Sequence, residues 1–136
     1  MADKVPFDLV TPTRVLVSDE ADMVVLPGGD GDIGVLPSHS PLLTTVRPGA
    51  IDIHKSGKVT ARFFIASGFA EVTPERLTIL AEEAADVDEL DPAVTDQRLA
   101  DAKEAIEAAR SDAEQVAAST ELRIAEALIA ITHTPG

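Results

Sequence analysis

One stretch of the chain, residues 23–49, constrains the fold most because it is dense in glycine and proline. Its centre reads Gly-Asp-Gly-Asp-Ile-Gly and satisfies the G-x-G-x-x-G pattern of a dinucleotide-binding loop. Such a loop requires a helix that starts at the last glycine, but Pro37 and Pro41 follow and forbid it. Asp30 and Asp32 would also repel a phosphate at close range. The stretch therefore predicts a turn, with glycines at positive φ, that joins two β-strands.

Composition and charge exclude several classes of function. Hydrophobic residues make up 45% of the 136 residues and aromatic residues only 3%, so a core is expected and it must be aliphatic. A net charge of −13 repels phosphate backbones and anionic lipids, so we expect no nucleic-acid partner and membrane contact only through another protein. The absence of cysteine excludes disulfides, thiol chemistry and cysteine-ligated zinc. No segment approaches about 18 consecutive apolar residues, so no transmembrane helix is predicted.

The first part of the chain, residues 1–86, reads as short β-strands. Apolar and polar residues alternate in several segments, which include residues 5–9, 51–54, 59–65 and 76–79. Turn residues separate the segments, among them Lys55-Ser56-Gly57-Lys58, Ser67-Gly68 and Thr73-Pro74-Glu75. Eight to ten strands at this spacing predict an antiparallel β-sandwich or a flattened barrel.

The second part, residues 87–136, reads as a linker and two helices. Residues 93–130 contain no glycine or proline and twelve alanines. Asp91 before Pro92 predicts a helix start, and Ser111 begins a capping box, so we expect helices at 92–109 and 112–131. One long helix is the alternative. The expected apolar stripe consists of Leu99, Ala102, Ile106, Ala109, Ala113 and Val116, followed by Ile124, Ala127, Leu128 and Ile131.

The helices offer little apolar area, because their stripe consists mostly of alanine. We therefore expect a marginally stable hairpin that can detach from the sandwich. Residues 82–91 hold six acids in ten residues and are interpreted as a solvated linker.

No constellation of residues predicts catalysis or metal binding. His39, His54 and His133 have no metal-ligand spacing, and no metal site is expected. A nucleophilic Ser/His pair at His39 lacks an orienting carboxylate, so a structural role in a loop is favoured. Asp30 and Asp32 lack the third ligand and the closing glutamate of a calcium loop. The residues alone thus predict an acidic β-domain with a helical hairpin, more plausibly a subunit or adaptor than an enzyme.

A resemblance to a known family predicts more than the residues alone. Six segments match, in order and spacing, the epsilon subunit family of bacterial F-type ATP synthase, which is called delta in mitochondria: FDLVTP at 7–12, MVVLPG at 23–28, GDIGVLPSHSPLLT at 31–44, VRPG at 46–49, SGFAEV at 67–72 and LTILAE at 77–82. The long central segment is the most specific. The helical part matches this family in kind and length only.

The resemblance implies a β-sandwich of about ten strands followed by a two-helix antiparallel hairpin, an α+β fold. It implies a non-catalytic subunit of the central rotor stalk, which couples proton flow through the c-ring to ATP synthesis through gamma. The family's c-ring contact corresponds to Asp30, Gly31 and Asp32. Its gamma contact corresponds to Thr11, His39, Leu42 and Thr44.

In this family the hairpin can reach the alpha/beta hexamer and inhibit hydrolysis, and some members bind ATP there. The ATP motif is incomplete here: Leu90 and Asp91 match, but its arginine is missing, and Arg98 stands four residues late. We therefore expect no bound nucleotide and no cofactor. The segment from Asp91 onward has four lysines and arginines against nine acids, which predicts weak inhibition at best.

The location implied by the resemblance is the cytoplasmic face of the bacterial inner membrane, as a peripheral part of the synthase. Two other functions stay open. The first is an unrelated β-sandwich adaptor without catalysis. The second is an enzyme that uses His39 with nearby carboxylates.

Overall fold

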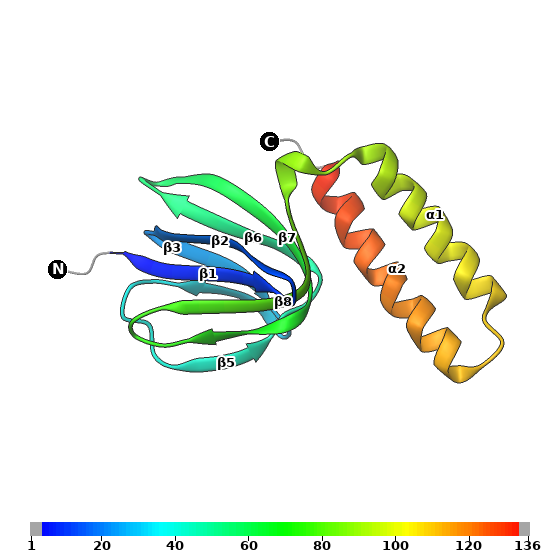
Figure 1. Ribbon diagram of the computed structural model, residues 1–136, viewed down its shortest axis with the longest axis horizontal. Helices are drawn as coiled ribbons and strands as arrows, with labels where there is room; N and C mark the ends of the chain where they lie inside the picture. The colour runs from blue at the N-terminus through cyan, green and yellow to red at the C-terminus, as the bar shows by residue number, and fades with distance from the viewer. Residues whose placement is uncertain (1–3, 134–136) are drawn as a thin grey trace. The chain divides into compact units, whose positions relative to one another are not determined.

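The computed structural model describes residues 4–133 of the chain. The strands are β1 (Val5–Thr11), β2 (Arg14–Ala21), β3 (Met23–Gly28), β4 (Gly31–Val35), β5 (Leu42–Thr45), β6 (Gly49–Lys55), β7 (Lys58–Val72) and β8 (Leu77–Asp86). They are followed by the 3-10 turn η1 (Val87–Glu89) and the helices α1 (Pro92–Ala108) and α2 (Asp112–Thr132). The chain divides after Asp86 into two compact units, one of strands and one of helices (Figure 1).

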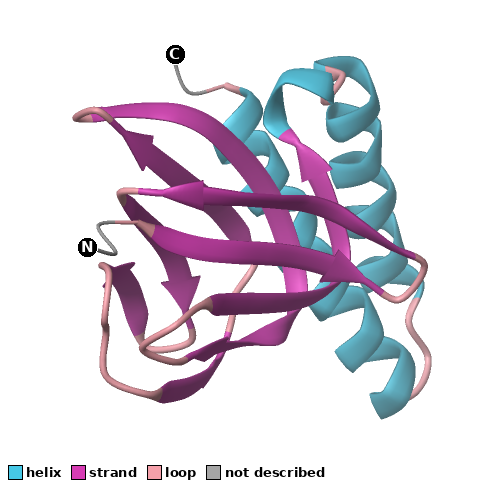
Figure 2. Ribbon diagram, turned by 60° about the vertical axis from the view of Figure 1, so that its left-hand side comes forward, coloured by secondary structure: helices cyan, strands magenta, loops and turns pink. Residues whose placement is uncertain are grey.

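Backbone hydrogen bonds order the strands as β2-β1-β8-β7-β6-β3-β4, with β5 beside β7. Strand β7 pairs with β6 over its first half and with β5 over its second half, so the sheet folds over into two layers (Figure 2). The predicted β-sandwich followed by two helices is confirmed. It differs from the expectation in that β1 and β8 run parallel. These two strands are far apart in the sequence, so no tight turn forces them to be antiparallel.

The described residues form eight strands rather than about ten, because Ser67-Gly68 is not a turn. Strand β7 runs 15 residues through this dipeptide. Ala66 lies opposite Glu83 and Gly68 lies opposite Ala81, so the register is the same on both sides of Ser67, and Ser67 itself has no partner. Ser67 has φ 60° and Gly68 has φ 138°, so this dipeptide kinks a continuous strand without inserting an extra residue. A turn and a kink with positive φ use the same residue types, so the sequence pattern did not separate them.

The interpretation of residues 82–91 as a solvated linker is wrong for its first half. Strand β8 continues to Asp86, and residues 83–86 pair with residues 63–66 of β7. The acids are compatible with a strand because Glu82 is exposed and Ala81 is buried, which keeps the alternation of the two faces. Only η1 and the residues up to Asp91 connect the strands to the helices.

The core of the strand unit is aliphatic, as composition required, with two phenylalanines among its largest buried side chains. Alternating residues of each strand point inward and are almost fully buried, for example Val5, Phe7 and Leu9 of β1. The other large buried side chains are Val24, Leu26, Val35, Ile51, Ile53, Phe64, Ile65, Val72, Leu77 and Ile79. This contiguous burial supplies the main driving force for folding of the unit.

The helical unit is an antiparallel pair whose ends are capped as predicted. The Asp91 side chain accepts a hydrogen bond from the Ala93 amide at 2.9 Å, and Ser111 Oγ accepts one from the Glu114 amide at 3.1 Å. Ser111 therefore begins a new helix, and one long helix is excluded. Its buried residues are Thr95 and Ala102 of α1 and Ala118, Ile124, Ala125, Leu128 and Ile131 of α2.

Val116 is the exception to the predicted stripe, because its side chain is 66% exposed. Successive residues of a helix are about 100° apart, so Val116 points about 200° away from the buried Ala118. Ala113, which was also expected in the stripe, is exposed as well. The buried stripe of α2 starts at Ala118 and includes Ile124, Leu128 and Ile131, which the sequence predicted.

Candidate docking surface

The turn between β3 and β4 carries the acidic residues expected to contact the c-ring. Strand β3 ends at Gly28, β4 begins at Gly31, and the two pair directly as an antiparallel hairpin. The prediction of a turn in place of a phosphate-binding helix is thus confirmed. Of the four glycines between residues 28 and 34, only Gly31 has positive φ, at 146°.

Close packing explains why two of the other positions are glycine. A Cβ on Gly28 would lie 2.7 Å from the Gly31 carbonyl oxygen, and one on Gly29 would lie 2.5 Å from Thr45 Oγ1. The Gly29 amide also donates a hydrogen bond to the Thr45 carbonyl at 2.9 Å. The turn is therefore pressed against the end of β5, which fixes its position.

Arg47 braces this turn from the segment after β5. Its Nη1 donates to the Gly28 carbonyl at 2.6 Å, and its Nη2 forms an ion pair with Asp32. Its backbone amide donates to the Pro27 carbonyl at 2.9 Å. The Asp32 side chain is still 65% exposed, so the pair sits at the surface. Sequence reasoning missed Arg47, although its place before Pro48-Gly49 marks it as a residue at a bend.

The two acids of the turn therefore differ. Asp32 shares its charge with Arg47, whereas Asp30 is exposed and forms no ion pair with any residue from 4 to 133. An external cation would meet the full charge of Asp30 but a partly neutralised Asp32. The geometry favours Asp30 as the stronger of the two docking charges.

His39 lies in the connection between β4 and β5 and is held by the backbone. Its amide donates to the Leu36 carbonyl at 3.2 Å, and its Nδ1 lies 2.7 Å from the Ser40 carbonyl oxygen. A carbonyl can only accept, so Nδ1 carries a hydrogen and the neutral ring offers Nε2 as an acceptor. Within residues 4–133 no carboxylate orients this ring. The arrangement lacks the parts of a Ser-His-acid triad, and a structural role in the loop fits it better.

The four residues expected at the gamma interface fall in two places. Leu42 and Thr44 lie on β5, three and five residues after His39, and together they occupy one edge of the sheet. Thr11 ends β1, and its Oγ1 lies 3.3 Å from the Arg14 carbonyl oxygen. Strands β8 and β7 separate β1 from β5, so the structure brings three of these residues together and leaves Thr11 two strands away.

Other acids of the strand unit are held in internal pairs. The Ser18 hydroxyl, 2.6 Å away, and the Arg76 guanidinium lower the pKa of Asp8. The Lys55 ammonium and the Glu20 amide lower the pKa of Asp19. The Lys4 ammonium and the Ser56 amide lower the pKa of Asp22. These pairs stabilise the strands and leave the β3–β4 turn as a separate acidic feature.

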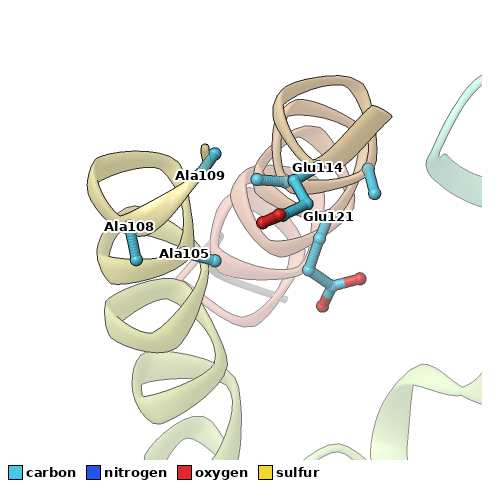
Figure 3. A pocket seen from close by; sticks show the side chains of 7 residues that line it. Ala105, Ala108, Ala109, Glu114 and Glu121 are labelled. Carbon is cyan, nitrogen blue, oxygen red and sulfur yellow. The ribbon is translucent and has the colours of Figure 1, made fainter. Parts of the chain in front are cut away.

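The helical unit has a shallow groove but little chemistry in it. The groove, of about 410 Å³, lies between α1 and α2 and is lined by Ala105, Ala108, Ala109, Glu114, Ala117, Ala118 and Glu121 (Figure 3). The lining consists of alanine methyl groups and two carboxylates, and the carboxylates disfavour phosphate. No group of three potential metal ligands occurs among the described residues.

The residues that match part of the ATP motif have other tasks in this structure. Asp91 caps α1, as described above, and Arg98 Nη2 lies 3.2 Å from Glu121 Oε2 in an ion pair that joins α1 to α2. Leu90 donates its amide to the Val87 carbonyl at 3.2 Å. In this arrangement Arg98 does not replace the missing arginine, because its guanidinium is engaged by a carboxylate.

Comparisons with known proteins agree on one family. Residues 4–87 match the model of the β-sandwich domain of the ATP synthase delta/epsilon chain. The ATP synthase epsilon chain of Paramagnetospirillum magneticum is 51% identical over 130 residues, which cover 96% of this chain and 98% of the relative. That of Rhodospirillum rubrum is 48% identical over 130 residues, covering 96% and 97%.

Solved structures support the fold. A chain in a cryo-EM structure of the Euglena gracilis mitochondrial ATP synthase, OSCP/F1/c-ring, superposes with a TM-score of 0.83 at 21% identity, covering 98% of this chain and 84% of that one. A chain of the Tetrahymena thermophila central stalk/c-ring structure gives 0.65 at 14% identity, covering 95% and 96%. None of the described helices is long and apolar enough to cross a membrane. With a matching domain model and relatives near 50% identity over almost the whole length, this chain belongs to the delta/epsilon chain family of ATP synthase.

Proposed function

We propose that the chain is a non-catalytic subunit of the central stalk of a proton-translocating ATP synthase. Its relatives at 48–51% identity along almost the whole chain are ATP synthase epsilon chains, and this observation carries the proposal. In this role the strand unit, residues 1–86, binds gamma and the c-ring and passes rotation between them. Catalysis belongs to the alpha/beta hexamer.

The c-ring contact is the β3–β4 turn, with Asp30, Gly31 and Asp32 at its tip. Asp30 supplies the free charge, and Arg47 holds the turn in place. An acidic tip of this kind fits a ring surface with basic side chains, because charges at the rim of an interface set orientation and association rate.

Gamma contacts the edge formed by His39, Leu42 and Thr44, and also Thr11 of β1, which lies two strands away. The helical unit, residues 87–136, reaches the alpha/beta hexamer. We expect weak inhibition of hydrolysis and no ATP site, because Arg98 pairs with Glu121 and the unit is poor in cations. ATP synthase is a membrane-associated complex, and we place the chain on the cytoplasmic face of the bacterial inner membrane.

Site-directed cross-linking in the intact synthase tests the c-ring contact. Asp30→Cys, labelled with a short photoreactive group, should form a covalent product with the c subunit. Lys58→Cys is the matched control, because Lys58 is exposed and lies at the other end of β6 from the β3–β4 turn. Equal c-subunit products from both positions, or none from Asp30→Cys, would contradict the proposed contact.

Family membership leaves little room for the two other functions. An unrelated adaptor does not account for the identity along the whole chain. An enzyme centred on His39 lacks an orienting acid. Co-purification with gamma and the alpha/beta hexamer checks the assignment directly, and a chain that purifies alone from a tagged cell extract would contradict it.

A further inference from the structure

Polar side chains join the two helices of the helical unit at their free ends. There the start of α1 lies beside the end of α2, whereas the loop before Ser111 joins the helices at the other end (Figure 1). Asp96 Oδ1 of α1 lies 3.2 Å from Nε2 of His133, which directly follows α2. An ionised carboxylate only accepts, so Nε2 carries a hydrogen and donates it. We call Thr95, Asp96, Thr132 and His133 the root clasp.

Thr95 adds a buried contact to the root clasp. It is the only buried polar residue among residues 4–133, with 3% exposure. Its Oγ1 lies 2.9 Å from the Pro92 carbonyl oxygen and 3.4 Å from Thr132 Oγ1. Thr132 Oγ1 in turn lies 2.9 Å from the Leu128 carbonyl oxygen. Each hydroxyl has one hydrogen and can also accept one, so one threonine donates to the other while that one donates to its own helix.

The half of the helical unit next to the loop has no such link. The shallow groove described above lies in this half and is lined mostly by alanine. Within the described chain, no side-chain hydrogen bond or ion pair joins residues 99–109 to residues 112–120. The large buried side chains of α2 are likewise confined to residues 124–131. The side-chain contacts that hold the helices together are therefore concentrated in the half that contains the root clasp.

The free ends are where a helical hairpin begins to open. The loop keeps the helices together near Ser111, whereas the contact between Asp96 and His133 closes a segment of 37 positions. The entropy lost on closing such a segment increases with its length. Helix ends also fray, and regions with few buried contacts open first. A contact between the free ends therefore opposes the step by which the two helices start to separate.

We propose that the root clasp keeps the helical unit closed, and that the helices separate only after the contact of Asp96 with His133 is lost. Both side chains are more than half exposed, at 58% and 54%, so the pair changes the opening of a marginally stable unit by a small factor. The root clasp is a property of the isolated chain and goes beyond the proposed function. In the assembly proposed above, it opposes every contact with the alpha/beta hexamer that needs the helices apart.

A double-mutant cycle in the isolated full-length chain tests the root clasp. NMR at one fixed pH follows amide exchange at residues 98–102 and 124–130. His133→Ala should speed this exchange about threefold. In the double variant with Asp96→Ala, the acceleration should fall short of the product of the two single factors by about threefold, because the pair can be lost only once.

Glu104→Ala is the matched control. It removes an exposed acid of α1 that forms no ion pair within residues 4–133. Combined with His133→Ala, it should give the product of the two single factors. His133→Lys keeps a cation near the end of α2 and should exchange more slowly than His133→Ala, with a smaller difference once residue 96 is alanine.

Two results would overturn the inference. The first is a pair of factors that multiply for Asp96→Ala and His133→Ala as they do in the control cycle. The second is faster exchange at residues 98–102 than at residues 104–108 in the wild-type chain, since a clasp at the free ends makes that half the more protected one. These measurements use the chain alone, so they are independent of the proposed function. A chain that fails to co-purify with gamma would contradict that function and leave the root clasp intact.

Discussion

The two units of the chain are stabilised in different ways. The strand unit buries large side chains such as Phe7, Leu26 and Ile79 in one contiguous cluster. The helical unit buries four large or medium side chains at one end and relies on alanine elsewhere. It adds caps at Asp91 and Ser111 and polar links such as the pair of Arg98 with Glu121.

This difference in buried side chains explains how one chain can combine a rigid unit of strands with a helical unit that unfolds more easily. Burial of a large apolar side chain contributes about 1.5–3 kcal/mol, while a partly exposed ion pair contributes about 1 kcal/mol or less. The strand unit therefore has a large free energy of unfolding, and the helical unit has a small one. Each of the following predictions tests this comparison.

The largest effect is expected from Gly68→Ala. A Cβ at Gly68 would lie 1.9 Å from the Leu80 carbonyl oxygen, so β7 and β8 would have to separate. We expect the free energy of unfolding of the strand unit to fall by about 3 kcal/mol or more. Urea unfolding followed by NMR signals of the strand residues measures it.

Gly57→Ala is the control for Gly68→Ala. Gly57 also has positive φ, at 77°, but apart from its chain neighbours no heavy atom would lie within 4 Å of a Cβ at this position. It should cost only about 1 kcal/mol, the cost of a left-handed backbone for a residue with a side chain. Equal losses for the two variants would show that steric contact at β8 is not what makes Gly68 necessary.

Amide exchange compares the units directly. In the isolated chain the amides of α1 and α2 should exchange about a hundredfold faster than those of the core strands, a difference of about 2.7 kcal/mol in opening free energy. The reason is the small apolar area of the helical unit. Hydrogen–deuterium exchange with mass spectrometry measures both regions in one sample, and equal protection would refute the comparison.

A smaller effect is expected from Ser111→Ala, which removes the cap of α2. The Glu114 amide would lose its partner, and the helical unit should lose about 1 kcal/mol. Ser119→Ala is the same change inside α2 and should cause no loss, because alanine favours a helix interior. Helicity during thermal unfolding reports the result. A matching loss in the strand unit would mean that the units unfold together.

The smallest expected effect is the pH-dependent contribution of Asp8 to the free energy of unfolding. Because the pKa of Asp8 in the folded chain is lower than its ordinary value of 3.8, its contribution to stability is present above that value and is lost as the pH falls through the folded pKa. Asp8→Asn should therefore cost less than about 1 kcal/mol near neutral pH and nothing in strong acid. Asp30→Asn makes the same change in charge without breaking an ion pair. Urea midpoints across pH measure both, and a constant difference for Asp8→Asn would contradict the assignment.

Local features of the fold were predictable from the sequence, and features that depend on strand register were not. Alternation placed Phe7 and Leu9 in the core, and the caps at Asp91 and Ser111 defined the helices, because each signal lies within a few residues. The kink at Ser67-Gly68 was mistaken for a turn, since both use residues with positive φ.

The same division applies to the candidate site. The resemblance assigned Asp30 and His39 from matching segments, but it gave no reason to single out Arg47. Arg47 reaches Asp32 across 15 positions of sequence. Such contacts between distant residues are not encoded in any short pattern.

The Arg47 brace has a mechanical consequence. One guanidinium ties the tip of the β3–β4 hairpin to the bend that leads into β6, so these two elements respond to an external force as one body. A force on Asp30 is shared between β3 and β6 instead of bending a lone loop. A part that transmits rotation loses less motion when its point of contact bends less under load. Here the side chain of Arg47 provides this stiffness.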